Sequence, residues 1–514
     1  MDGDRVNNAL RNTKWGVFQK TTNLLFPFIV RSVLIHILGA EYSGLNGLFV
    51  SILSVLNLTE LGFSNAIIFS MYKPAAEDNI EKMCALLNLY KRIYRIVGAI
   101  VTGFGLVVLP FVPDLITGEV PSDINIYILF IAFLLDSVLD YFLFGYKTSL
   151  LSVYQKEYVI SRNSLIYNIT LYSAQILVVV LAKNYYLFVL LIPVCRVILN
   201  FMNSHNADRM FPEIVPKGRV SDSEIKELKK NVYGLAIWKI GGASRSSFDS
   251  IFISKFLGLV TIAIYSNYFC VINGVDTIIS VICTSITAGV GNKIAMESRE
   301  LNYEDFRKFQ FLYMWIVGWC VVCIYCLIQP FMRLWMGDDY MFSNEIVILL
   351  CYYFFMLKKG DINSVYYHAA GLWWNGRYRS IVEAVLNLIL NYFLGKYFGI
   401  IGIILATIIS FSIVNLYGSY IVFRDYFKNK QYIVFCLENL CTLSVVCVSC
   451  MVTQWVIEWV AGIFNVQGSV PYLAIGGLAC IVIPNIIFAL VYCFRNPYRS
   501  YMVYAWNVFQ RRRR

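Results

Sequence analysis

The chain has 514 residues, of which 58% are hydrophobic and only 15% are charged, and its formal net charge is +11 at pH 7. Ordinary soluble domains contain roughly 45–50% apolar and 25% charged residues, so this composition excludes a soluble globular protein. Hydrophobic runs of about 20 residues recur from end to end, and each is long enough to cross a ~30 Å hydrocarbon core as a helix. The short alternating strands of a membrane β-barrel do not contain such runs.

The sequence predicts an all-α polytopic membrane protein with fourteen transmembrane helices. In chain order, the hydrophobic runs are Trp15–Leu38, Leu45–Tyr72, Ile93–Val112, Ile124–Gly145, Ser164–Leu181, Tyr185–Phe201, Tyr233–Phe256, Ile262–Val290, Phe309–Ile328, Ile346–Ala369, Ile381–Tyr397, Ile400–Phe423, Tyr432–Trp459 and Pro471–Phe494. With a cytosolic N-terminus, the predicted outer loops hold only Lys183, Arg333 and Lys396 of the 43 Lys and Arg residues. The positive-inside rule therefore predicts that both termini are cytosolic. The positive charge reflects this topology, and nucleic acid is not an expected partner.

Loop lengths divide the predicted helices into two halves and a final pair. The longest internal polar stretch, residues 206–231, separates the sixth helix from the seventh. We therefore predict one six-helix lobe at 1–231 and a second at 232–431, with a central cavity between them. Residues 432–514 form two more helices and a basic tail, which we expect to contact anionic membrane lipids.

Two local patterns predict where helices begin and end. Ser221 and Glu224 have the spacing of a capping box, which predicts the start of a helix late in the long polar stretch. A Leu-Gly pair ends a predicted helix at 38–39 and again at 257–258, with similar residues after each pair. This faint repeat is what two similar helix bundles would produce.

Charged residues inside the hydrophobic runs are the strongest functional signal, because such side chains usually face a cavity or a charged partner. The first predicted helix carries Lys20 and Arg31, and the seventh carries Lys239, Arg245 and Asp249. Arg31 and Arg245 are predicted at similar depths, roughly 20–25 Å from the cytosolic ends of their helices. All five are therefore candidates to line one substrate cavity. The structural alternatives are that Arg31 snorkels to the outer surface and that Arg245 and Asp249 neutralise each other.

A second set of polar residues inside the hydrophobic runs could either bind a coupling cation or join neighbouring helices. Glu60 lies in the second predicted helix, and Glu383, Asn387 and Asn391 form an i, i+4, i+8 stripe on the eleventh. These residues are candidates to couple transport to a proton or sodium gradient, with a hydrogen-bonded lock between helices as the alternative. Gly360 marks an expected break in the tenth helix. Nearly all fourteen cysteines lie in apolar runs without nearby loop ligands, so we expect neither a metal site nor a cofactor.

Two stretches of this sequence resemble a known transporter family. They are NTKWGVFQKTTNLLFPFIVRSVLIHILGAEYSGLNGLFVSILSVLNLTELGFSNAIIFSMYKP, at 12–74, and IVEAVLNLILNYFLGKYFGIIGIILATIIS, at 381–410. Both are similar to Wzx-type polysaccharide flippases of the multidrug/oligosaccharidyl-lipid/polysaccharide exporter superfamily. The likeness extends over the whole chain through helix count and loop pattern. Its motifs are helix-packing signatures, which are more specific to the family than to the substrate.

The resemblance implies a transporter rather than an enzyme. It implies two six-helix lobes around a cationic cavity that moves undecaprenyl-pyrophosphate-linked oligosaccharides across the bacterial cytoplasmic membrane, for surface polysaccharides such as lipopolysaccharide, capsule or exopolysaccharide. A glycan polymerase and other assembly proteins are the implied protein partners. Related flippases place essential arginines on their first helices, which matches Arg31 in type, and a guanidinium fork suits a pyrophosphate.

Two other functions remain open. A multidrug exporter of the same superfamily is one alternative, although a cavity for organic cations should be net acidic and the candidates above are mostly basic. A membrane glycan polymerase is the other alternative, and the short predicted outer loops disfavour it because they leave no room for a large catalytic loop.

Overall fold

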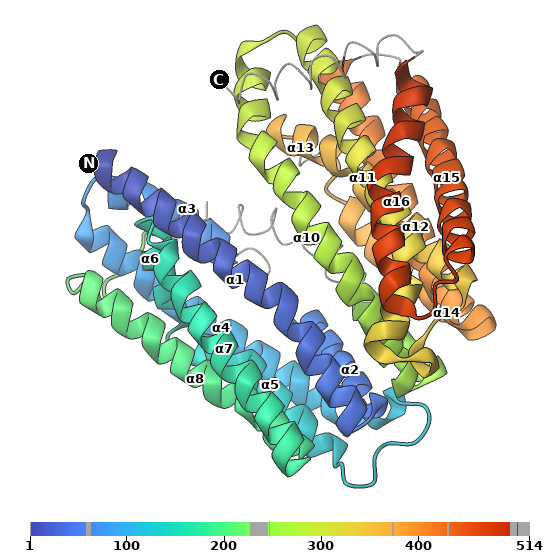
Figure 1. The fold of residues 1–514 in the computed structure, drawn as a ribbon. Coiled ribbons are helices and arrows are strands. Elements are labelled where there is room, and N and C mark those ends of the chain that lie inside the picture. Colours follow the sequence, from blue (N-terminus) through green and yellow to red (C-terminus); the bar gives the residue numbers. More distant parts are fainter. Residues whose placement is uncertain are drawn as a thin grey trace. The chain divides into compact units, whose positions relative to one another are not determined.

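The computed structural model describes residues 2–57, 63–226, 245, 247–372, 375–428, 431–493 and 501. Regular secondary structure in this part of the chain is helical throughout (Figure 1). The chain divides into two compact units, which we call unit 1 (Met1–Ala263) and unit 2 (Ile264–Arg514). The predicted lobe boundary at residue 231 lies outside the described residues.

Unit 1 consists of long helices joined by short turns, drawn in blue to green in Figure 1. In chain order, the helices are α1 (Asp2–Ile37), α2 (Ala40–Leu56), α3 (Phe63–Ala76), α4 (Ile80–Val108), η2 (Leu109–Phe111), η3 (Pro113–Leu115), α5 (Ile126–Phe142), η4 (Gly145–Lys147), α6 (Thr148–Val153), α7 (Glu157–Ala182) and α8 (Tyr185–Met210). Residues 247–257 are also helical and belong to this unit. The helix α7 packs against α1 and α8, and α5 packs against α4 and α8.

Unit 2 is organised around one central helix, α11. After α10 (Leu259–Met296), which begins in unit 1, the elements are α11 (Arg299–Met336), η5 (Asp338–Tyr340), α12 (Asn344–Lys359), α13 (Asp361–Ala369), α14 (Arg379–Ile421), η6 (Val422–Phe427), α15 (Tyr432–Ile463) and α16 (Ser469–Cys493). The most apolar window of α11 is 61% buried, the highest share among the candidate membrane spans. This helix packs against α12, α15 and α16, so the predicted final pair of helices belongs to the body of unit 2.

The described helices confirm a polytopic membrane protein. Within the described residues, eight helices are long and apolar enough to cross a membrane, or nine if α5 and residues 145–153, bent by 48°, form one span. The predicted hydrophobic runs fall mainly on described helices, apart from residues 58–62 of the second run, Phe494 at the end of the fourteenth and part of the seventh. The first half of the seventh run, 233–244, lies outside the described residues, and α1 does not meet the same criteria of length and hydropathy. The total of fourteen therefore stays a prediction.

The helix α14 is a hairpin of two antiparallel arms. Its backbone turns at Gly399, where φ is 59° and ψ is −136°, a combination that only glycine adopts readily. In a straight helix, Asn387 and Thr407 would lie about 30 Å apart. Instead, the Asn387 side-chain amide donates a hydrogen bond of 2.9 Å to the Thr407 hydroxyl. The runs predicted as the eleventh and twelfth spans therefore lie side by side as separate arms.

Three local signals in the sequence are confirmed as helix boundaries. Gly39 (φ 125°) separates α1 from α2, and Gly258 (φ 85°) separates residues 247–257 from α10, so the two Leu-Gly pairs have the same local role. Residues 222–226 are helical, and the Ser221 amide donates to the Glu224 carboxylate at 3.4 Å, as one half of a capping box does. Finally, α12 ends and α13 begins on either side of Gly360.

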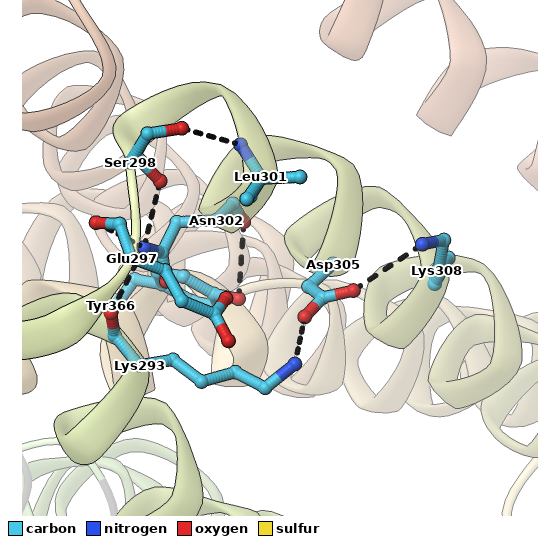
Figure 2. A network of polar contacts seen from close by, with 8 residues as sticks. All are labelled: Lys293, Glu297, Ser298, Leu301, Asn302, Asp305, Lys308 and Tyr366. Carbon is cyan, nitrogen blue, oxygen red and sulfur yellow. Dashed lines mark hydrogen bonds and ion pairs between the residues drawn. The ribbon is translucent and has the colours of Figure 1, made fainter.

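A buried polar network closes one end of unit 2, at the turn between α10 and α11 (Figure 2). The side-chain amide of fully buried Asn302 donates to the carbonyl oxygens of Lys293 at 3.2 Å and Ser298 at 3.0 Å. The Tyr366 hydroxyl, on α13, donates to the Asn302 carbonyl at 3.3 Å. Asp305 forms an ion pair with Lys293 across the same turn. These contacts join the turn to α13 and hold three helices of the unit together.

Candidate functional site

An ionic cluster that we call the Arg196 triad lies among the helices of unit 1. The Arg196 guanidinium, on α8, donates to both oxygens of Asp136, on α5, at 3.0 and 3.4 Å. A second carboxylate, Asp140, lies 3.9 Å from the guanidinium, and the Asn200 amide donates to it at 2.6 Å. Residues 136 and 140 are one turn apart on α5, as residues 196 and 200 are on α8, so each helix presents one polar face to the other.

A cavity of about 350 Å³ borders the Arg196 triad. Its wall includes Ser137 and Asn57, whose side chains share a hydrogen bond of 3.0 Å. The Arg196 guanidinium also lies 5.4 Å from the centre of the Tyr167 ring, within the range of a cation–π contact. Since the triad combines one cation with two carboxylates, the charged wall of this cavity has a net charge of −1.

A second cluster, which we call the Lys358 triad, lies inside unit 2. The Lys358 side chain, at the end of α12, is only 4% exposed and forms ion pairs with Asp276 on α10 and with Asp361, the first residue of α13, at 2.8 Å. Its ammonium also donates to the Ser280 hydroxyl at 3.2 Å, and the Tyr313 hydroxyl on α11 donates to Asp361. Four helices thus meet at one buried lysine. The positive end of the α13 dipole also stabilises the Asp361 carboxylate, which lies at the start of that helix.

The predicted stripe on the eleventh run lies in the first arm of α14. Glu383, Asn387 and Asn391 are all buried, with at most 5% exposure. The Asn391 amide donates to the side-chain oxygen of Asn387 at 3.2 Å, and the Asn387 amide donates in turn across the hairpin to Thr407. The amides therefore make the interhelical contact that the helix-lock alternative requires. Cation binding by these residues stays a prediction, as does any role of Glu60, which lies outside the described residues.

The predicted cavity residues that the structure describes all belong to unit 1. Lys20 is exposed on α1, and Arg31 is partly exposed one to two turns before the end of the same helix. Arg245 is partly buried, and Asp249 is 2% exposed. Arg31, Arg245 and Asp249 all make further polar or ring contacts. Lys239 lies outside the described residues, and the joint role of these side chains in a cavity stays a prediction.

Neither triad was predicted from the sequence, although the members of both lie inside predicted hydrophobic runs. The Arg196 triad carries a detectable sequence signal. Asp136 and Asp140 are spaced i,i+4, Arg196 and Asn200 have the same spacing, and the second pair follows the first by 60 positions. Such matched spacing is expected when two helices face each other at the same depth. Asp276 and Lys358 carry no comparable spacing signal, because their contact depends on how α10 and α12 pack.

Comparisons with known proteins identify the fold. No protein-family model matches the sequence, and no curated protein matches it. Among solved structures, the lipid II flippase MurJ in an inward closed conformation matches with a TM-score of 0.64 and 16% identity, over 94% of this chain and 98% of that chain.

Multidrug transporters match over a smaller share of the chain. An inward-facing multidrug resistance MATE family transporter matches with a TM-score of 0.58 and 11% identity, covering 83% of this chain and 96% of that chain. A mutant form of the Vibrio cholerae MATE transporter VcmN matches with a TM-score of 0.54 and 11% identity, covering 84% and 99%. At these identities the likeness concerns the fold. This chain therefore shares the fold of the lipid II flippase and of these multidrug transporters.

Proposed function

We propose that this protein is a flippase that moves polyprenyl-pyrophosphate-linked oligosaccharides across the bacterial cytoplasmic membrane for surface polysaccharide synthesis. The observation that carries the proposal is the match to a lipid II flippase, which covers 94% of this chain and 98% of that chain. The multidrug transporters cover 83% and 84% of this chain. A lipid-linked glycan is therefore the substrate class that agrees with the more extensive likeness.

Such a substrate needs a polar path for its head group only. Sugars and a pyrophosphate cannot cross hydrocarbon without losing their hydrogen bonds to water, whereas the polyprenyl tail remains in the bilayer. Lys20, Arg31, Lys239 and Arg245 are the residues that we propose to bind the pyrophosphate. Arg31 is the favoured anchor, because a guanidinium donates two parallel hydrogen bonds to phosphate oxygens.

The membrane potential assists movement in the proposed direction. Moving each negative charge outward from a negative interior gains about 2.3 kcal/mol per 100 mV, so a dianionic pyrophosphate gains about 4.6 kcal/mol. A proton or sodium gradient is a further proposed energy source, with Glu60 and the Glu383 stripe as its candidate residues. Anionic lipids and a glycan polymerase are the proposed partners at the membrane.

The deciding experiment uses the full chain in proteoliposomes with a fluorescent polyprenyl-pyrophosphate glycan, and measures its arrival in the opposite leaflet. Arg31→Gln should reduce head-group binding about 10- to 100-fold, because a charge-assisted contact contributes about 1.5–3 kcal/mol. Arg31→Lys should retain part of the activity, since the charge survives without the planar fork. Lys14→Gln is the matched control, because Lys14 is an exposed cation of the same helix. Equal activity of Arg31→Lys and Arg31→Gln would exclude the pyrophosphate role of this arginine.

One observation favours a second candidate, the export of organic cations. The cavity beside the Arg196 triad has a net charge of −1, which would attract a cation and repel a pyrophosphate. The same proteoliposomes therefore receive a cationic dye in a parallel assay. Export of the dye without any movement of the lipid-linked glycan would assign the protein to the multidrug exporters and reject the flippase.

A further inference from the structure

A second, larger cavity of about 760 Å³ opens in unit 2, and its wall contains no member of either triad. Four helix ends form it: the last turns of α11 and α15 and the first turns of α12 and α16. Its volume is within the range of about 300–1,000 Å³ that is usual for small-molecule sites. Under the predicted topology, the α11–α12 and α15–α16 loops are outer loops, so the cavity opens on the outer face of the membrane.

Aromatic residues beside the cavity agree with a position at the membrane surface. The Trp455 and Trp459 rings stack with centroids 6.4 Å apart, and these residues are 64% and 57% exposed. They alternate along α15 with Gln454 and Glu458, which line the cavity. Exposed tryptophans near a helix end are typical of the interface between head groups and hydrocarbon. The cavity therefore lies where the head group of a lipid-linked molecule would emerge.

Amides and hydroxyls in the cavity wall are held in fixed orientations. The Gln329 amide donates to the Phe342 carbonyl at 2.8 Å and to the Asn344 side chain at 3.2 Å, while the Tyr268 hydroxyl donates to the Gln329 oxygen at 2.6 Å. On α15 and α16, the Gln454 amide donates to Glu458 at 2.7 Å and to the Tyr472 hydroxyl at 3.2 Å.

These hydrogen bonds leave groups available for a ligand. The Tyr472 hydroxyl accepts from Gln454 and keeps its own proton for another acceptor, and Glu458 keeps its second carboxylate oxygen. The rings of Tyr325 and Tyr472 add apolar surface to the wall. Fixed amides, a carboxylate, a hydroxyl donor and ring faces together match a sugar, which presents hydroxyls around its edge and C–H groups on its faces.

The charge of the wall argues against a phosphate ligand. Arg333 is neutralised by Asp338, with the guanidinium and carboxylate 2.7 Å apart, and Glu458 leaves the wall with a net charge of −1. A lipid phosphate would be repelled, whereas a neutral sugar or an amino sugar would not. The glycan portion of a lipid-linked oligosaccharide is therefore a better ligand than any anionic head group.

We propose that this cavity is a glycan subsite, which binds a neutral or amino sugar of the substrate after the head group has reached the outer face. The proposal rests on the proposed flippase function, because it takes the glycan of that substrate as its ligand. The residues that line the subsite belong to unit 2, whereas the proposed pyrophosphate anchor Arg31 belongs to unit 1.

The test measures binding of lipid-free sugars to the full chain in nanodiscs by saturation-transfer NMR. The probes are chitotriose, maltotriose and a glucosamine trimer, each at up to about 10 mM, since a few hydrogen bonds give millimolar affinity. At least one probe should bind, and Gln454→Leu and Tyr472→Phe should each weaken its binding about tenfold. Tyr472→Phe removes a single hydroxyl, so its effect does not depend on a disturbed fold.

Two controls separate the subsite from the rest of the protein. Asp339→Asn alters an exposed carboxylate in the same short helix as Asp338 but outside the cavity wall, and should leave binding unchanged. Arg31→Gln should reduce flipping of the lipid-linked substrate without affecting probe binding, so the flippase function is tested by the proteoliposome assay and the subsite by sugar binding. Binding of no probe, equal binding by the wall variants, or displacement of the sugar by glycerol phosphate would each overturn the glycan subsite.

Discussion

Units 1 and 2 each contain an ionic triad, and the two triads differ in exposure and in the number of helices they join. Each buries one basic side chain between two carboxylates inside apolar helices. The Arg196 side chain in unit 1 is 28% exposed and borders a cavity, whereas the Lys358 side chain in unit 2 is 4% exposed. The first triad joins two helices, and the second joins four at a helix break. A buried charge costs several kcal/mol unless it is paired, so both basic side chains must stay paired, and the cavity beside the Arg196 triad has room for water or a ligand.

This difference predicts that the Lys358 triad stabilises the fold and that the Arg196 triad tolerates change. Replacement of Lys358 by methionine leaves Asp276 and Asp361 without the cation that pairs with both of them. We expect Lys358→Met to lower the free energy of unfolding by about 3–5 kcal/mol, measured by denaturant titration in mixed micelles. The matched control is Lys359→Met, because the Lys359 ammonium forms no ion pair with any described residue. Its expected cost is about 1 kcal/mol, and equal costs for the two lysines would contradict a special role of the triad.

Removal of the Arg196 guanidinium in unit 1 should lower the free energy of unfolding less than removal of the Lys358 ammonium in unit 2. In Arg196→Met, water in the cavity can hydrate Asp136 and Asp140, so we expect the free energy of unfolding to fall by about 1–3 kcal/mol in the same titration. Adding Asp136→Asn should recover part of that loss, since one unpaired carboxylate is removed. A loss as large as that of Lys358→Met, without recovery in the double variant, would show that the two triads are equally closed.

The smallest expected effect concerns an exposed ion pair of unit 1. Glu224 pairs with Lys82, and their side chains are 36% and 40% exposed. The hydrogen bond from Lys82, followed by that from Ser221, lowers the pKa of the Glu224 carboxyl below its ordinary value of 4.5. The ionised form is thus favoured in the folded state, so the pair stabilises the helix at 222–226 above about pH 4.5 and less as pH falls through the lowered pKa.

Backbone amide hydrogen exchange of residues 222–226 tests the predicted direction of this pH dependence. At pH 7, Glu224→Gln should raise exchange slightly over wild type, because an exposed pair contributes roughly 0–1 kcal/mol. At pH 3 the two proteins should exchange alike. A difference that grows toward low pH would mean that the carboxyl is stabilised in its protonated form.

The sequence by itself determined the class of the protein and much of its local structure. Long apolar runs require helices in a membrane, because backbone amides and carbonyls there must hydrogen-bond within the segment. The two Leu-Gly pairs, the break at Gly360 and the start of the helix after Ser221 were also predictable, since each depends on a few neighbouring residues. Arg31 and Asp249 were recognised as unusual for the same reason, but their roles require knowledge of what surrounds them.

Only the tertiary structure decided which polar residues meet. Arg196 and Asp136 are 60 positions apart, and Lys358 and Asp276 are 82 positions apart, so no local rule pairs them. The cavity in unit 2 likewise depends on four helix ends that are distant in the sequence. A helix's apolar run sets its length and its membrane location, whereas its rotation and its neighbours are set by packing against other helices. That packing brings the charges of distant helices into contact.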